Sequence, residues 1–195
     1  AEAIFARFSQ RMGSQRARWL DAYGSTCRAT HVAHEQSEAL LDARMYCLTD
    51  RWQRTRAVVE RLLAEPTRET VGLAIDALWA VPSIERCENS DPTSLASSSR
   101  DPRQRQRTLA LAKKLADATA RRDLGDFAGA QTLLDELVPQ LERAEDPQLW
   151  AGGVFELGRL QVHDQNPRAR ATFERALSLA ATARDDDLTG EIASE

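Results

Sequence analysis

Glycine and proline are scarce in this chain, which contains 9 and 7 of them among 195 residues. Sandwiches and barrels need many tight turns, and these two residues usually supply them. Their scarcity therefore argues against an all-β fold. The chain also lacks any apolar run near the ~18 residues that a membrane-spanning helix needs, so we expect no direct membrane insertion. Its 42% hydrophobic and 29% charged residues are typical of a chain that buries a core.

The chain also lacks a large excess of charge of one sign, because the formal net charge is only −4. Residues 1–100 contain 13 basic and 13 acidic residues, and residues 101–195 contain 13 and 17. Nucleic-acid-binding domains carry a basic face, so we expect no nucleic-acid partner. Only Lys113 and Lys114 are lysines, and the other 24 basic residues are arginine. We interpret this bias as a coding preference of a GC-rich bacterial genome and not as a functional signal.

Recognisable catalytic groups are also missing. The three histidines form no triad, and no serine lies in a GxSxG turn. Cys27 and His31 share a helix face at a spacing that metal ligands use, but the predicted turn before His34 breaks that arrangement. Because no nucleophile, base and metal set is assembled, we expect no cofactor, no metal site and no enzymatic activity of this chain by itself.

Apolar residues recur at helical spacing along the first half, which predicts an all-α fold. A long helix is predicted over 3–31 and a second over 35–64, and the two form an antiparallel hairpin that turns near 32–34. Thr67 is a predicted N-cap for a third helix, which should end before Pro82. The second helix has the clearer coiled-coil-like seam, with members alternately four and three residues apart: Leu41, Met45, Leu48, Trp52, Thr55, Val59 and Leu62.

Aromatic residues mark the same stripes. Phe5, Met12 and Trp19 recur at seven residues in the first helix, and Trp52 lies on the seam of the second. We therefore expect Trp19 and Trp52 in the core. Trp79 lies beside the stripe of the third helix and Trp150 opens a later one, and these two are candidates for a partner contact.

The three cysteines allow a geometric argument about pairing. The second and third helices pivot near residue 65, so residue 47 lies opposite residue 84, and Cys87 can fold back onto Cys47. Cys27 lies opposite residue 39, which leaves it roughly 12 Å along the axis from Cys47, beyond the ~7 Å between Cα atoms that a disulfide allows. We predict a Cys47–Cys87 disulfide. The alternative is three reduced, buried cysteines, depending on the compartment.

Residues 88–102 are rich in serine, aspartate and proline, and are predicted to be a linker between a helical subdomain at 1–87 and a repeat region at 103–195. In that region a pattern repeats with an offset of 39, which predicts stacked helix pairs. A third pair begins near 185 and is truncated. Because the chain begins at Ala1 without Met and ends within a helical pattern, we expect it to be part of a longer protein. The repeated residues are Ala130, Leu134 and Leu137, followed by Ala169, Phe173 and Ala176.

The motifs GDFxxA at 125–130 and LGxxQ at 157–161 resemble the tetratricopeptide repeat (TPR) family, across residues 105–195. The sequence departs from the TPR pattern at two positions. Arg121 replaces an aromatic residue, and at Pro167 the turn is expected to be one residue shorter. The resemblance implies an α-solenoid with a partner groove along the first helix of each pair, where arginines would grip a carboxylate. The alternative is that this face packs on the hairpin or on further repeats. The implied groove residues are Leu115, Thr119, Arg122, Phe155, Arg159 and Val162.

The first half resembles the region between the catalytic domain and the TPR array of large myxobacterial-type serine/threonine kinases. The resemblance lies in the segments 26–30, 35–48 and 81–87. It implies a non-catalytic interaction or sensory region, which binds a protein or peptide partner or associates with itself on the periplasmic or extracytoplasmic side of a membrane. The kinase motifs themselves are absent. The alternative is a cytoplasmic TPR segment of a transcriptional regulator or a signalling ATPase.

Overall fold

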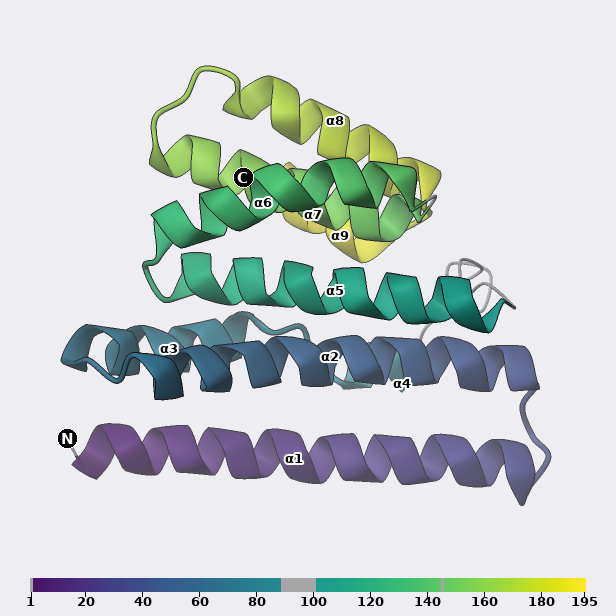
Figure 1. Ribbon diagram of the computed structural model, residues 1–195. Helices are drawn as coiled ribbons and strands as arrows, with labels where there is room; N and C mark the ends of the chain where they lie inside the picture. Colours follow the sequence, from purple (N-terminus) through teal and green to yellow (C-terminus); the bar gives the residue numbers. More distant parts are fainter. Residues whose placement is uncertain (1, 89–100, 145) are drawn as a thin grey trace. The chain divides into compact units, whose positions relative to one another are not determined.

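The computed structural model describes residues 2–88, 101–144 and 146–195, and over these ranges it contains helices and no strands (Figure 1). The predicted all-α class is confirmed. The chain divides into two compact units. The first consists of residues 1–98 and 123–125, and the second of residues 99–122 and 126–195. Most of the predicted linker, residues 89–100, lies outside the described residues. The helices are α1 (Glu2–His31), α2 (Glu38–Ala64), α3 (Arg68–Ala80), α4 (Glu85–Glu88), α5 (Pro102–Asp123), α6 (Phe127–Arg143), α7 (Pro147–His163), α8 (Ala169–Thr182) and α9 (Asp186–Ala193).

The first unit is built on the predicted hairpin of α1 and α2, which run side by side in Figure 1 and contact each other. The Ser37 side chain caps α2 by accepting a hydrogen bond from the Leu40 N–H at 3.2 Å. Thr67 caps α3 as predicted, and Thr70 completes the capping box. Each cap satisfies backbone donors that the first helical turn leaves unpaired. The starts of α2 and α3 therefore follow from local sequence, and α3 packs on both α1 and α2.

The seam of α2 supplies much of this unit's core. Leu48 is fully buried, as is Leu78 of α3. Two predicted core residues are not: Phe5 is 70% exposed and Trp52 is 44% exposed, so the expectation that Trp52 is a core residue is wrong. A straight helix drifts by about 20° for every seven residues, so residues spaced by seven leave the seam towards its ends. Trp19 is half-buried, and its Nε1 donates to the Leu48 carbonyl at 2.8 Å.

The second unit contains α5 to α9, and three of its helices begin at a capping aspartate. Asp126, Asp146 and Asp185 each accept a hydrogen bond from the N–H three residues later. A helix therefore begins near residue 185, as predicted. The α7–α8 connection runs over 164–168, whereas the α5–α6 connection runs over 124–126. The expected shorter turn is wrong, because the Asn166 side chain accepts the Arg168 N–H in an extra turn before α8.

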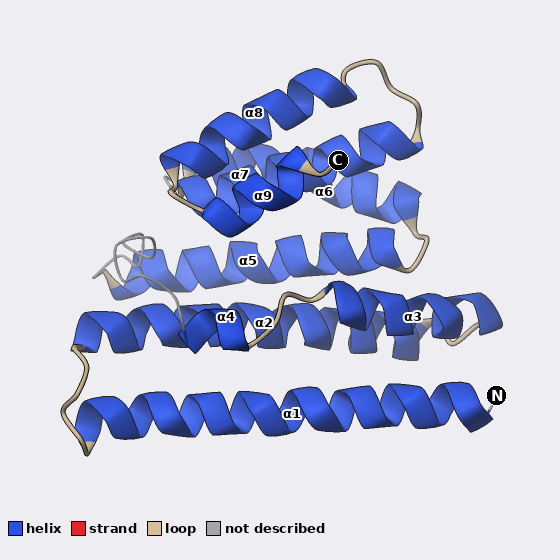
Figure 2. Cartoon of the chain, turned by 180° about the vertical axis from the view of Figure 1, so that it is seen from behind, coloured by secondary structure: helices blue, strands red, loops and turns tan. Residues whose placement is uncertain are grey.

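Successive helices of this unit pack through small residues, and Figure 2 shows α7, α8 and α9 close together. A Cβ added to Gly158 would lie 2.6 Å from the Phe173 ring, so α7 and α8 approach more closely than any larger residue would allow. The repeated Ala130, Leu134 and Leu137 lie in one buried cluster with Leu115 of α5, and Ala176 lies in the next cluster. In the second set, Phe173 packs against this next cluster and Ala169 is half-buried, so most of the repeated residues take part in the core.

Asp146 offers a test of how burial affects this cap. It is only 5% exposed, and burial raises its pKa, although the N–H groups of Leu149 and Gln148 act in the opposite direction. The folded state therefore holds the proton more tightly than the unfolded chain does. This contribution to stability is present below the unfolded pKa and is lost as the pH rises through the folded pKa.

We therefore expect Asp146→Asn, which keeps the cap, to be at least as stable as the wild type at pH 7. The free energy of unfolding of the wild type should rise relative to that of the variant as the pH falls through the pKa of folded Asp146. Urea unfolding of both proteins across this range measures the difference, and comparison with the variant cancels the titration of other groups. If acidification lowers the stability of the wild type relative to the variant, this prediction is wrong.

Candidate functional site

A disulfide between Cys47 and Cys87 holds the segment after α3 against α2, with 5.6 Å between the two Cα atoms. This is the pair that the helix geometry favoured, and Cys27 is free and half-buried. Trp19, Met45 and Ile84 pack against the buried cluster that contains both disulfide cysteines. The disulfide therefore lies directly behind residues 81–84, which form one wall of a cavity.

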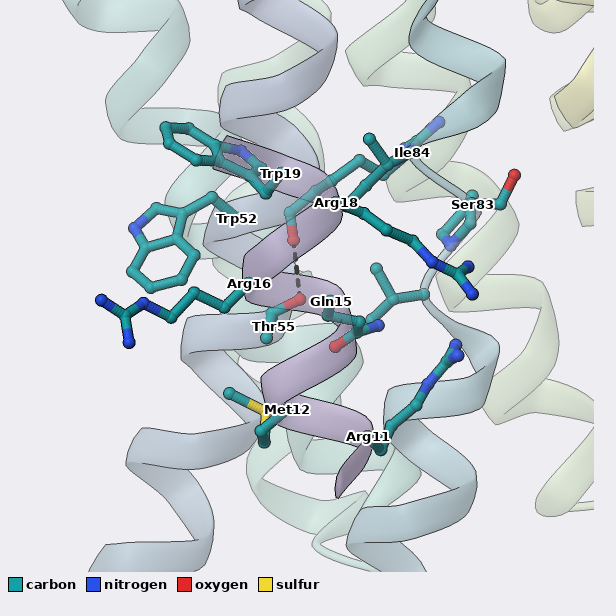
Figure 3. A pocket seen from close by; sticks show the side chains of 13 residues that line it. Arg11, Met12, Gln15, Arg16, Arg18, Trp19, Trp52, Thr55, Ser83 and Ile84 are labelled. Atoms are coloured by element: carbon teal, nitrogen blue, oxygen red, sulfur yellow. Dashed lines mark hydrogen bonds between the residues drawn. The ribbon is translucent and has the colours of Figure 1, made fainter. Parts of the chain in front are cut away.

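This cavity lies between α1, α2 and the segment joining α3 to α4, and has a volume of about 50 Å³ (Figure 3). We call it the arginine pocket. Four arginines line it and no aspartate or glutamate does. Its lining residues are Arg11, Met12, Gln15, Arg16, Arg18 and Trp19 of α1, Arg51, Trp52 and Thr55 of α2, and Val81, Pro82, Ser83 and Ile84.

The four arginines differ in how far their charge is already balanced. Arg51 is balanced by Asp50, at 2.6 Å. Burial alone would raise the pKa of Asp50, but Arg54 and Arg51 overcome that effect and hold it below its ordinary value. Asp50 therefore stays charged, and it is shared by Arg51 and Arg54, at 2.6 and 3.0 Å. The other three arginines that line the pocket all belong to α1.

On α1, Arg18 forms an ion pair with Glu85 at 3.2 Å, in which both side chains are more than half exposed. Arg16 is exposed and has no ion-pair partner among the described residues. Arg11 lies 3.7 Å from the centre of the Trp79 ring. Burial lowers the pKa of Arg11, Arg18 lowers it further, and Glu85 acts in the opposite direction. The Arg11 guanidinium nevertheless remains charged at neutral pH, as arginine does in proteins.

Some buried polar atoms of lining residues have no hydrogen-bond partner within the described parts of the chain. Among them are the donor Arg11 Nε and the acceptor Gln15 Oε1. The Gln15 amide is held in place because its Nε2 donates to the Leu78 carbonyl at 3.2 Å. Buried polar groups in folded proteins are nearly always paired. This donor and this acceptor are thus unsatisfied within the described residues, and both are shielded from solvent.

The groove that the TPR resemblance implied is not a continuous exposed surface. Leu115 and Phe155 are buried at 5% and 2% exposure, so that part of the expectation is wrong. Their large apolar side chains fill the space between neighbouring helices of the second unit. Thr119 is half-buried, and Val162 alone of the six residues is more than half exposed.

The two arginines of that predicted groove already have carboxylates from the chain itself. Arg122 Nε donates to Glu156 Oε2 at 2.7 Å, and both side chains are almost buried. Arg159 pairs with Glu195 at 3.0 Å and approaches Glu191 at 3.7 Å. The sequence analysis missed Glu156 and the C-terminal glutamates as partners. The spacing of 34 residues between Arg122 and Glu156 equals the period of a typical TPR unit and was an available signal.

Two further features bear on the type of site. Within the described residues, no cluster of three or more His, Cys, Asp or Glu side chains could hold a metal ion. None of the described helices is both long enough and apolar enough to cross a bilayer.

Sequence reasoning missed this pocket because its walls come from three segments that are distant in the sequence. One signal was present: Arg11 and Arg18 are seven residues apart, directly before Met12 and Trp19, so they flank the apolar stripe. Trp79, a candidate for a partner contact, is 64% exposed. In searches of known proteins, no family model, curated protein or solved structure matches this chain.

Proposed function

We propose that this chain is a non-catalytic protein-interaction region whose binding surface is the arginine pocket. The observation that carries the proposal is the convergence of Arg11, Arg16 and Arg18 with Trp19 and Trp52 on one cavity. Tryptophan and arginine are the residue types most enriched among the dominant contacts of protein interfaces. A cavity of about 50 Å³ is well below the roughly 300–1,000 Å³ of typical small-molecule sites. It fits one side chain of a partner better than a whole metabolite.

The wider setting is part of the same proposal. The succession of packed helices from α6 to α9 supports a TPR-like α-solenoid, and the resemblance of 26–30, 35–48 and 81–87 supports a regulatory region of a membrane-linked bacterial serine/threonine kinase. The Cys47–Cys87 disulfide supports an extracytoplasmic location, because disulfides persist mainly in oxidising compartments.

Free thiols in the denatured, never-reduced protein test the compartment. One thiol, with a Cys47–Cys87 peptide pair in mass spectrometry, is expected. Three thiols in protein prepared under oxidising conditions would favour the cytoplasmic alternative, a TPR segment of a transcriptional regulator or signalling ATPase.

Selection from a displayed library of random short peptides tests the interaction function. We expect a recurring class of sequences to be enriched on the intact chain and to bind it in solution. No enrichment above the level seen with the chain after thermal unfolding would refute a peptide-binding function.

A further inference from the structure

We infer that this chain self-associates through one side of its α1–α2 hairpin, so that two hairpins related by a two-fold axis form a four-helix bundle. We call this side the hairpin flank. It carries Phe5, Leu20 and Tyr23 of α1 with Trp52 and Leu63 of α2. The inference goes beyond the proposed function, because the flank shares Trp52 with the arginine pocket but extends past the pocket along both helices.

The flank exposes large apolar side chains where a solvated helix face would be polar. Each of its five residues is at least 44% exposed, and the exposed fraction reaches 73% at Leu63. They make up five of the nine large hydrophobic residues that are exposed in the described parts of the chain. Single exposed apolar residues are ordinary on a protein surface, whereas a group of large ones marks an interaction site.

The flank residues share one face of each helix. Phe5 and Tyr23 are 18 residues apart, which is five full turns of an α-helix at 3.6 residues per turn. Trp52 and Leu63 are 11 residues apart, or about three turns. Trp19 joins the two helices, because its ring stacks on Tyr23 at 5.1 Å and packs against Trp52 at 6.0 Å. The flank is therefore one surface and not a set of scattered residues.

The helices α3 and α4 pack on a different side of the hairpin. Gln15 donates to a backbone carbonyl of α3 at 3.2 Å, and Arg18 pairs with Glu85 of α4. Figure 3 shows Arg16 and Trp52 on one side of α1 and Arg18 on the other. The flank is therefore the side of the hairpin that α3 and α4 leave uncovered.

The size of the flank favours a partner that presents two helices. α2 has 27 residues, so the hairpin is about 40 Å long, and two packed helices are about 20 Å wide. The resulting footprint of about 800 Å² is the area that each partner contributes to an interface of standard size. A single peptide or helix would cover only part of this width. A second copy brings an identical pair of helices, and the two pairs can bury their apolar faces in the centre of a four-helix bundle.

The spacing of the large residues fits a two-fold partner. The rings of Trp19 and Trp52 are 6.0 Å apart and mark one level of the hairpin. The midpoint of Phe5 and Leu20 lies six to seven residues before Trp19, and the midpoint of Trp52 and Leu63 lies five to six residues after Trp52. Because the helices are antiparallel, the two midpoints are level to about 1.5 Å. One two-fold axis at this level places Phe5 against Leu20 of the second copy, and Trp52 against its Leu63.

The charges of the flank fit the same arrangement. Arg16 has no ion-pair partner among the described residues. Glu60 pairs with Arg56 at 2.6 Å, but both side chains are about half exposed, and such surface pairs are weak. The two-fold axis passes between residues 57 and 58 of α2, so it brings Glu60 of the second copy to the level of Arg16. The carboxylate can then be shared by both arginines.

Sedimentation equilibrium of the intact chain tests the self-association. We expect a dimer whose dissociation constant rises at least about a hundredfold in Phe5→Lys combined with Leu63→Lys, because the interface would have to bury these charges. Val32→Lys combined with Val162→Lys is the matched control, since both valines are exposed and lie off the flank. This control should keep the wild-type dissociation constant. Thermal unfolding checks that both double variants keep the wild-type fold.

Cross-linking with a short bismaleimide tests the two-fold arrangement. In a Cys27→Ser background, a chain with Phe5→Cys is mixed with a chain that has Leu20→Cys. We expect these two chains to be linked to each other. The chain with Phe5→Cys alone should give little linked dimer, because the axis separates this residue from its copy by roughly 22 Å.

The outcomes separate the inference from the proposed function. A monomer at every concentration, or equal weakening by the two lysine double variants, overturns the inference. A dimer that links Phe5→Cys to itself and not to Leu20→Cys also overturns it. If the chain is monomeric and the displayed library still enriches peptides, the interaction function stands and the inference fails. If the chain dimerises as expected and the library enriches nothing, peptide binding is refuted and the inference stands.

Discussion

Reduction of the Cys47–Cys87 disulfide is expected to lower the free energy of unfolding of the first unit by about 4 kcal/mol. The two cysteines are 40 residues apart, and cross-linking a loop of this length restricts the unfolded chain by about that amount in the chain-entropy account. For a domain of this size, a loss of 4 kcal/mol corresponds to a fall in the melting temperature of roughly 15–30 °C.

The loss should be felt first around the arginine pocket, because residues 81–84 form one of its walls and lead directly into α4. α4 is only one helical turn long. Besides the disulfide, it is held by the exposed Arg18–Glu85 pair and by Arg44 Nη2, which donates to the Glu88 carbonyl at 2.6 Å. We therefore expect peptide binding at the pocket to weaken on reduction even below the melting temperature.

The measurement compares thermal unfolding of the wild type, with and without reductant, and of a Cys47→Ser, Cys87→Ser double variant. Cys27→Ser is the control, because Cys27 is outside the disulfide and only half-buried; it should change the melting temperature little. If the double variant melts at the wild-type temperature, the disulfide adds no stability to the folded protein.

The helix boundaries of this protein are largely local properties, and for that reason they could be predicted. Thr67 can cap α3 and Asp146 can cap α7 whatever they pack against, because each bonds an N–H three residues away. Pro82 stops α3 by its own chemistry. The α7–α8 turn failed as a prediction, because the side chain of Asn166 and the missing N–H of Pro167 combine into an extra turn that spacing alone does not encode.

Burial was harder to predict than helicity. Trp52 lies on the seam of α2 but is 44% exposed beside the arginine pocket, and exposure is a property of tertiary packing. The groove prediction failed for a related reason: Leu115 and Phe155 were placed by analogy on the inner face of each first helix, whereas in this chain large side chains at those positions fill the core. A periodic pattern shows which face of a helix is apolar, but not which residues pack against that face.

The arginine pocket was hidden for a different reason. Nearly every basic residue of the chain is arginine, so composition gave Arg11, Arg16 and Arg18 no distinction. What distinguishes them is that they line one cavity together with Arg51, which Asp50 already balances. Charge balance is a property of pairs in space, and the sequence shows only the separate members.

Arg122→Ala is expected to destabilise the second unit by about 3–5 kcal/mol, the usual cost of leaving one member of a buried ion pair uncompensated. Arg122 and Glu156 have side chains only 12% and 9% exposed. Without the guanidinium, the Glu156 carboxylate must stay charged in a poorly solvated position or take up a proton. Arg122 also joins α5 to α7, so the loss should weaken packing along the whole helix array.

The neighbouring Arg121 provides the matched control. It pairs with Asp117 and Asp126, but its side chain is 30% exposed and its partners are more exposed than Glu156. Arg121→Ala should therefore cost about 1 kcal/mol or less. Urea unfolding of the two single variants measures the contrast. Equal losses would mean that burial does not set the energetics of the Arg122 pair.

The double variant Arg122→Met with Glu156→Leu separates the buried charge from the packing. Replacing a buried ion pair by apolar residues of similar volume is often neutral or stabilising, so the double variant should recover most of the stability that Arg122→Ala loses. If it does, the pair fixes which helix faces meet, and contributes little net stability. If the double variant is as unstable as the single one, the attraction between Arg122 and Glu156 itself stabilises the array, and apolar packing cannot replace it.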